Sequence, residues 1–120
     1  MVTTFEEETK DLTQDELVYI AALIAGFNRH TEENPIKAPE IVRNIRNHAP
    51  LGSLAAKFSE PKLRKCVNYI RVNGMIPLIA TSNGYFVSNK PEVIRKQIFS
   101  LEERARSIKT CADGLKKFLR

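Results

Sequence analysis

Apolar residues recur at intervals of three and four positions near the start of the chain, as they do on the buried side of an α-helix. The residues in this pattern are Leu17, Ile20, Ala21, Ile24 and Phe27. Thr13 and Glu16 precede them with the spacing of a capping box, in which each side chain binds the other residue's backbone N–H. The pattern therefore predicts a core helix over about residues 14–29, followed by a polar loop that ends at Pro35.

Two more amphipathic helices are predicted further along the chain. The first follows Pro39, which is tolerated at the start of a helix because its missing N–H has no partner to lose there. Its narrow apolar stripe consists of Ile41, Val42 and Ile45. The second runs from an N-cap at Ser59 to a stop at Gly74. Its buried side is predicted to hold Leu63, Cys66, Val67 and Ile70.

A β-hairpin is predicted after the third helix. Leu78–Ala80 and Tyr85–Val87 are short apolar runs, and the Asn83-Gly84 pair between them tolerates the positive φ angles of a tight turn. The two aromatic residues of the second run face opposite sides of the strand, so one of them enters the core. Three helices followed by a hairpin predict a mainly α (α+β) fold, a winged helix-turn-helix with a two-stranded hairpin as its wing. In that fold the third helix reads the major groove.

The end of the chain is predicted to be one long helix. From Pro91 onward, apolar residues alternate at spacings of four and three, which is the 3.5-residue repeat of a coiled coil. These residues are Ile94, Ile98, Leu101, Ala105, Ile108, Ala112, Leu115 and Leu119. A seam of this kind needs a partner helix, so we expect a homodimer. The alternative is two helices that fold back on the domain, because Ser100 and Glu103 form a second possible capping box and Gly114 weakens the helix.

Composition and charge set the remaining limits. The chain has 120 residues, 42% of them hydrophobic, and contains no apolar run of the roughly 20 residues that span a bilayer. Its acidic first 12 residues do not resemble a signal peptide, so we expect an acidic flexible arm over 1–12 on a soluble, intracellular protein. The winged-helix domain is then expected over 13–90 and the dimerisation segment over 91–120.

The uneven distribution of charge points to a partner. Residues 1–16 carry a net charge of −5, and since the whole chain carries +5, residues 17–120 carry +10. A basic body favours nucleic acid as a partner. We therefore expect double-stranded DNA to bind the outward side of the third helix.

Candidate DNA-binding residues follow from this geometry. Arg64 and Asn68 are candidates for base edges, because Arg pairs with guanine and Asn with adenine. Phosphate contacts are expected from other residues of the third helix and from the second helix; the second-helix arginines could equally serve only solubility. The phosphate-contact candidates are Arg43, Arg46, Lys62, Lys65 and Arg71, and Asn83 in the hairpin turn is a further candidate for DNA binding.

The sequence offers little for catalysis. It has no glycine-rich phosphate loop, no nucleophile with an identifiable His and acid, and no carboxylate pair set among apolar residues. Cys66 and Cys111 are not spaced as metal ligands or as a disulfide framework. We expect a protein that is not an enzyme and that has no cofactor and no metal.

The run from Leu63 to Val87 resembles the third helix and wing of small winged-helix proteins encoded by bacteriophages and prophages. Their pattern is an (V/L)R-x-x-(I/V)-x-x-(I/L)R-x-x-G helix followed by a hairpin with G-Y-(Y/F). Their helical tail has an L-E-x-R-A-x-x-I pattern, which Leu101 to Ile108 match. The resemblance covers about residues 13–112. It is carried by core positions, turn residues and scattered arginines, and includes no catalytic signature.

The resemblance implies DNA binding in transcription or replication control, in the cytoplasm of a bacterial host. The positions that match the family's helix are Arg64, Asn68 and Arg71, and those that match its wing are Gly84 and Tyr85. The turn T-S-N-G departs from the pattern because it has no Arg or Lys, which weakens the case for a minor-groove contact by the wing.

A protein-interaction adaptor or assembly factor is the alternative function, because winged helices also bury the third helix or the wing against other proteins. An adaptor surface would present apolar anchors among few charges. The third helix instead carries Arg64, Lys65 and Arg71, with Tyr69 and Val72 as its exposed apolar residues. The charges favour DNA.

Overall fold

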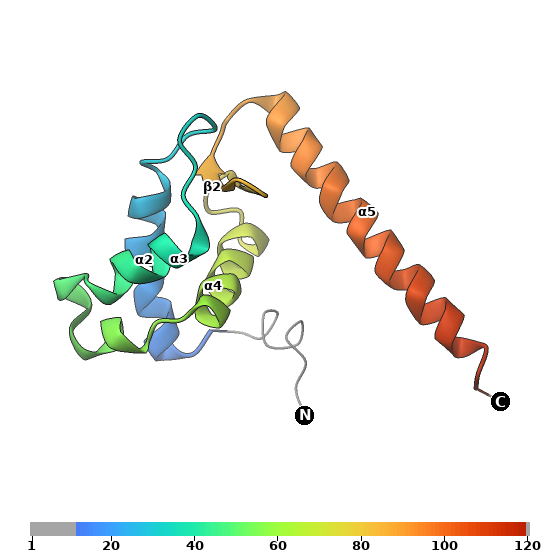
Figure 1. Cartoon of the computed structure of the whole chain (residues 1–120), viewed down its shortest axis with the longest axis horizontal. Coiled ribbons are helices and arrows are strands. Elements are labelled where there is room, and N and C mark those ends of the chain that lie inside the picture. Colours follow the sequence, from blue (N-terminus) through green and yellow to red (C-terminus); the bar gives the residue numbers. More distant parts are fainter. Residues whose placement is uncertain (1–11, 120) are drawn as a thin grey trace. The chain divides into compact units, whose positions relative to one another are not determined.

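The computed structural model describes residues 12–119. The chain divides between Ser88 and Asn89 into two compact units. The first contains α2 (Gln14–Phe27), α3 (Ala38–Arg46), the 3₁₀ segment η1 (Ala49–Lys57), α4 (Glu60–Val72), β1 (Leu78–Thr81) and β2 (Gly84–Val87). The second contains α5 (Pro91–Lys116). The molecule is thus mainly helical with one antiparallel hairpin, as the sequence predicts at this level (Figure 1).

The capping box at the start of α2 is confirmed. The Glu16 backbone N–H donates to the Thr13 hydroxyl at 3.2 Å, and the Thr13 N–H donates to the Glu16 carboxylate at 2.9 Å. The predicted buried side of this helix is wrong in part, because Leu17 is 36% exposed and Tyr19 is buried. The Tyr19 ring packs on Phe58 with ring centroids 4.8 Å apart, and its hydroxyl donates to the Leu54 carbonyl. Because Tyr19 turns inward to bind Leu54, 35 residues away, the buried face of α2 is rotated from the predicted one.

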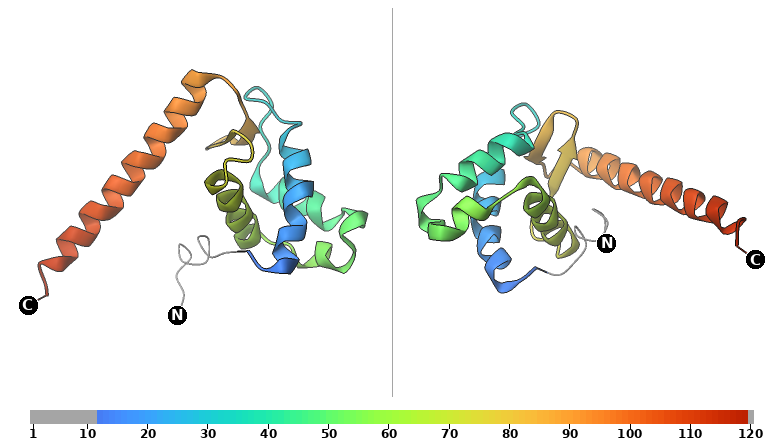
Figure 2. Two further views of the ribbon diagram at one scale, coloured as in Figure 1. Left: turned by 180° about the vertical axis from the view of Figure 1, so that it is seen from behind. Right: turned by 60° about the horizontal axis from the view of Figure 1, so that its bottom comes forward.

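The predicted buried side of α4 is confirmed in full. Its four inward residues are Leu63, Cys66, Val67 and Ile70, and Leu63, Cys66 and Ile70 are completely buried. They join α2 and α3 in one core, and Figure 2 shows these three helices packed together beside the hairpin. Ser59 caps α4 through its side chain, as expected.

The hairpin forms with a turn one residue earlier than predicted. Thr81 pairs with Gly84, so Ser82 and Asn83 form the turn, and no residue other than glycine has a positive φ in the described chain. The Thr81 hydroxyl accepts from the Asn83 N–H, which stabilises this turn without the positive φ that was expected of Asn83. Phe86 is the buried aromatic residue of β2, at 2% exposure.

The segment before α3 pairs with the hairpin. Ile36 forms an antiparallel bridge with Tyr85, through N–H···O bonds of 2.9 and 2.8 Å. Tyr85 belongs to β2, so β2 lies between Ile36 and β1. The bridge fixes the start of α3 relative to the hairpin.

The helix α5 is continuous over 26 residues, or about 39 Å at 1.5 Å per residue. It passes through Ser100 and Gly114 without a break, so the predicted single long helix is confirmed and the alternative of two separate helices is wrong. The helix ends at Lys116, which leaves Leu119 of the predicted seam beyond it. Within the described residues, no helix combines the length and the hydrophobicity needed to cross a bilayer.

Candidate nucleic-acid interface

The outward side of α4 holds most of the candidate DNA-binding residues. Arg64, Asn68 and Arg71 follow one another at intervals of four and three, so they lie along one side of the helix. All three are half-buried, and so is Lys62 on the other flank. The inward residues that hold α4 in the core fix the direction in which these polar side chains point.

Lys65 has a partner within the fold. Its ammonium lies 2.6 Å from the Glu16 carboxylate, and the two side chains are only 15% and 12% exposed. The same carboxylate oxygen accepts from the Thr13 N–H, so it joins the start of α2 to α4. Sequence reasoning assigned Glu16 to the capping box alone, because nothing in the sequence relates it to a lysine 49 residues away.

The contacts of Glu16 set its ionisation. Burial raises the pKa of this carboxyl, but the hydrogen bonds from Lys65 and Thr13 and the charge of Lys65 outweigh burial, so its pKa lies below the usual value of 4.5. Glu16 and Lys65 therefore form a charged pair at neutral pH that stabilises the packing of α4 on α2.

Two arginines of the candidate set also bind the backbone. The Nε of Arg71 donates to the Leu78 carbonyl at 3.2 Å, which links the end of α4 to β1. The Nε of Arg46 donates to the Phe58 carbonyl at 2.8 Å. Each contact orients the guanidinium against the fold, and Arg46 remains exposed.

The remaining candidates come from α3 and the hairpin. Arg43 is exposed on α3, and Asn83 is exposed in the turn between β1 and β2. We call the outward polar residues of α4 the α4 surface; they are Lys62, Arg64, Asn68 and Arg71. Lys65 is left out because its ammonium is held by Glu16.

The positive charge is divided between the two units of the chain. Residues 12–88 have nine Lys and Arg against six Asp and Glu, for a net charge of +3. Residues 89–120 have nine against four, for a net charge of +5. Half of the +10 that the sequence analysis counted over residues 17–120 therefore lies after Ser88.

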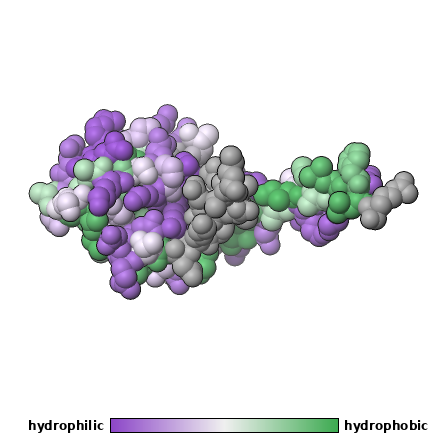
Figure 3. All heavy atoms as spheres, turned by 90° about the horizontal axis from the view of Figure 1, so that it is seen from below, coloured by the Kyte–Doolittle hydropathy of each residue, from purple (hydrophilic) through white to green (hydrophobic). Residues whose placement is uncertain are grey.

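Most of the candidate dimerisation residues of α5 are open to solvent. None of its residues is buried, and Ile98, Ile108 and Leu115 are 48%, 59% and 69% exposed. Figure 3 shows apolar side chains in green at the surface of α5 beside charged ones in purple. Ion pairs between Glu103 and Arg106 and between Asp113 and two lysines lie off the apolar seam.

The other seam residues differ in their exposure. Leu101, Ala105 and Ala112 are exposed, whereas Ile94 is half-buried. Leu119 is 78% exposed and follows the end of the helix. A seam of mostly exposed apolar side chains over the length of α5 leaves a surface that a second helix could cover.

The side chains that could do chemistry are dispersed. Burial raises the pKa of the Cys66 thiol to about 12, so it stays protonated at neutral pH. Cys111 is exposed on α5. Among residues 12–119, no three His, Cys, Asp or Glu side chains are placed to hold a metal ion.

Comparisons with protein-family models, with curated proteins and with solved structures find no match to this chain.

Proposed function

We propose that this protein is a non-catalytic winged-helix protein that binds duplex DNA as a homodimer. In a bacteriophage or another mobile element it would regulate transcription or replication. The proposal requires three parts: a helix that enters the major groove, cations that contact phosphates, and a surface that joins two chains.

The order of the elements supports the winged-helix part of the proposal. The chain passes through α2, α3 and α4 and then enters a hairpin, and the bridge between Ile36 and Tyr85 adds a third short strand segment beside β2. In helix-turn-helix proteins, residues of the recognition helix contact base edges in the major groove. Here α4 takes the place of that helix.

The observation that carries the proposal is the division of α4 into two sides. One side is a fully apolar part of the core, and the other presents Arg64, Asn68 and Arg71 in a row. Arg and Asn are the side chains that pair with guanine and adenine through two hydrogen bonds. The Nε of Arg71 is anchored on the Leu78 carbonyl, which orients its guanidinium at the end of α4.

The dimer rests on α5. Its seam of exposed apolar side chains has the spacing of a two-stranded coiled coil. A two-fold dimer reads half-sites about 34 Å apart, one turn of DNA, so we expect the target to be an inverted repeat.

Binding to a random 30-base-pair duplex, followed by fluorescence anisotropy over a salt series, tests the proposal. Each phosphate that the protein neutralises should contribute about −0.9 to the slope of log affinity against log salt. We expect a clearly negative slope for the natural chain. We also expect weaker binding for Arg64→Ala, with unchanged circular dichroism as evidence that the variant folds.

The second candidate function is that of a protein-binding adaptor. Val72 at the end of α4 is 74% exposed and Met75 is 43% exposed, and such side chains can anchor a protein partner. Absence of DNA binding at low salt would reject the DNA proposal and favour this function. Val72→Ser should then weaken the complex with the partner, whereas it should leave DNA affinity unchanged if the DNA proposal holds.

A further inference from the structure

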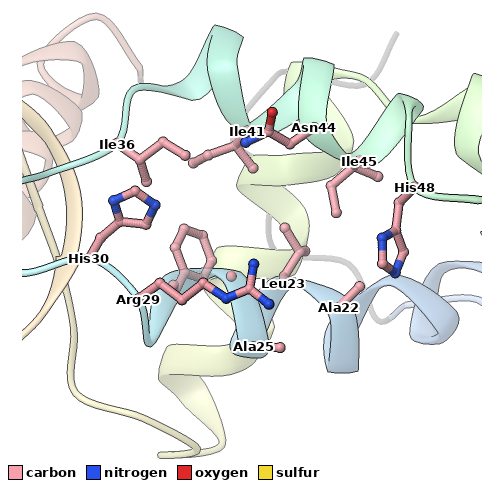
Figure 4. Close-up of a pocket in the computed structure, with 12 residues that line it drawn as sticks. Ala22, Leu23, Ala25, Arg29, His30, Ile36, Ile41, Asn44, Ile45 and His48 are labelled. Atoms are coloured by element: carbon pink, nitrogen blue, oxygen red, sulfur yellow. The ribbon is translucent and has the colours of Figure 1, made fainter.

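A pocket of about 180 Å³ lies between α2 and α3, on a part of the first unit that the α4 surface does not use (Figure 4). Its inner wall is apolar and includes Leu23, Phe27, Ile41 and Ile45, all of which belong to the core. The polar residues that line it are Arg29, His30, Asn44 and His48. An apolar wall with a few polar groups is the usual composition of a small-molecule site.

We propose that this pocket binds a small molecule that combines an apolar body of about one ring with a carboxylate. The proposal does not depend on DNA binding, because it rests on residues of the pocket alone.

The size of the pocket fits a single ring. An engineered cavity of about 150 Å³ lined by Leu, Ile and Phe binds benzene. The pocket here has a similar volume and a similar inner wall. A ligand of this class would bury its ring against Leu23, Phe27 and Ile45.

Small residues on α2 keep the pocket open. Ala22, Ala25 and Gly26 line it from this helix. Glycine weakens a helix relative to alanine, yet Gly26 does not have a positive φ, and a Cβ added there would meet no atom within 4 Å. Neither the backbone nor a neighbouring atom therefore requires glycine at this position, and its effect is to leave space in the wall.

The charges that line the pocket favour an anion. Within the described residues 12–119, no Asp or Glu lines the pocket. Arg29 extends along α2 in the direction of Leu23, and Asn44 lies across from it on α3 (Figure 4). Within residues 12–119 the side chains of Arg29 and His48 make no hydrogen bond or ion pair with the protein. A guanidinium and an amide are matched donors for a carboxylate.

His30 has a different role in the pocket. Its Nδ1 lies 3.0 Å from the Asn34 carbonyl, which fixes the ring against the loop that follows α2. We assign it to the wall of the pocket, and we assign recognition of the carboxylate to Arg29 and Asn44.

A titration of the full-length protein with 4-methylbenzoate and with 4-methylbenzamide, followed by two-dimensional NMR, tests the proposal. A ligand of about ten heavy atoms is expected to bind with a Kd on the order of 1 mM. We expect saturable chemical-shift changes for residues of α2 and α3. The benzoate should bind about tenfold more tightly than the benzamide, because the neutral amide cannot form the charged hydrogen bond that the carboxylate forms. Arg29→Gln should remove this preference.

A pair of leucine variants separates this pocket from other binding surfaces. Gly26→Leu places a side chain in the pocket and should abolish binding of both probes. Ala21→Leu is the control, since Ala21 is exposed on the same helix and does not line the pocket. Three results would overturn the proposal: no saturable shift at millimolar probe, binding that survives Gly26→Leu, or equal affinity for the two probes.

Discussion

Glu16 has two structural functions at the start of α2. Its carboxylate completes the capping box with Thr13, and it also accepts a hydrogen bond from the Lys65 ammonium. Both contacts favour the charged form, so the folded state binds a proton less readily at this group than the unfolded chain does. Folding stability at this residue is therefore linked to pH.

Glu16→Gln should lower the free energy of unfolding at pH 7 by about 1–2 kcal/mol, because it removes a charge-assisted hydrogen bond. The folded-state pKa of Glu16 lies below its usual value of 4.5. Its contribution is therefore complete above pH 4.5 and is lost as the pH falls through the lower folded-state pKa. Urea unfolding from pH 7 to pH 3 should show the natural chain and Glu16→Gln converging in acid.

Asp15→Asn is the matched control, because Asp15 is the exposed neighbour in the same first turn of α2. It should lose less stability than Glu16→Gln at pH 7. A stability difference between the natural chain and Glu16→Gln that is the same at pH 7 and pH 3 would contradict this account of the ion pair.

Gly84 is held at a position where a side chain has no room. Its φ is 128°, and an added Cβ would lie 2.5 Å from the Ile36 carbonyl oxygen. Gly84→Ala should therefore destabilise the protein by about 3 kcal/mol, through both backbone strain and separation of Ile36 from β2. Gly74→Ala should cost only about 1 kcal/mol, because Gly74 has a φ of 58° but open space around it. Equal losses of unfolding free energy in Gly84→Ala and Gly74→Ala, measured by urea unfolding, would contradict the role given to the contact with Ile36.

At the scale of elements, the sequence predicted the type and order of the three helices α2, α3 and α4 and of the hairpin. Helical spacing located the buried side of α4 because all four of its inward residues are apolar. It misplaced part of the buried side of α2, because Tyr19 enters the core with its hydroxyl bonded to a distant carbonyl. The turn of the hairpin was displaced by one residue, because Thr81 stabilises a turn that does not need a positive φ at Asn83.

The apolar seam of α5 makes a prediction at the same scale. Ile108 is 59% exposed in the middle of the seam. Sedimentation velocity should give the natural chain a mass of twice 13.6 kDa, and Ile108→Lys should shift it to the monomer, because a buried charge opposes coiled-coil pairing. Ser107→Lys adds the same charge off the seam and should remain dimeric. A monomeric natural chain, or equal effects of the two variants, would reject the dimer.

At the scale of the whole molecule, the candidate site could be predicted only as a set of polar residues, most of them on the third helix. The sequence located Arg64 and Asn68 on the outward side of α4, because its inward side was identified correctly. It could not show that Lys65 binds Glu16 or that Arg46 binds the Phe58 carbonyl, since these partners come from other elements. The pocket between α2 and α3 was also beyond prediction, because it depends on the spacing of two helices.

The distribution of charge also affects how the DNA-binding helix can be identified. The part of the chain after Ser88 carries more net positive charge than residues 12–88, so salt-dependent DNA binding alone would not distinguish α4 from α5. Lys62 on α4 and Lys96 on α5 provide a matched pair of lysines for that distinction. Neither side chain is buried.

The most direct test of DNA binding through α4 is therefore the salt dependence of duplex affinity for Lys62→Ala and Lys96→Ala, measured side by side. If Lys62 contacts a phosphate, its removal should make the slope of log affinity against log salt shallower by about 0.9. Lys96→Ala should leave the slope unchanged. An unchanged slope in Lys62→Ala, together with a shallower slope in Lys96→Ala, would place the DNA on α5 and contradict the account.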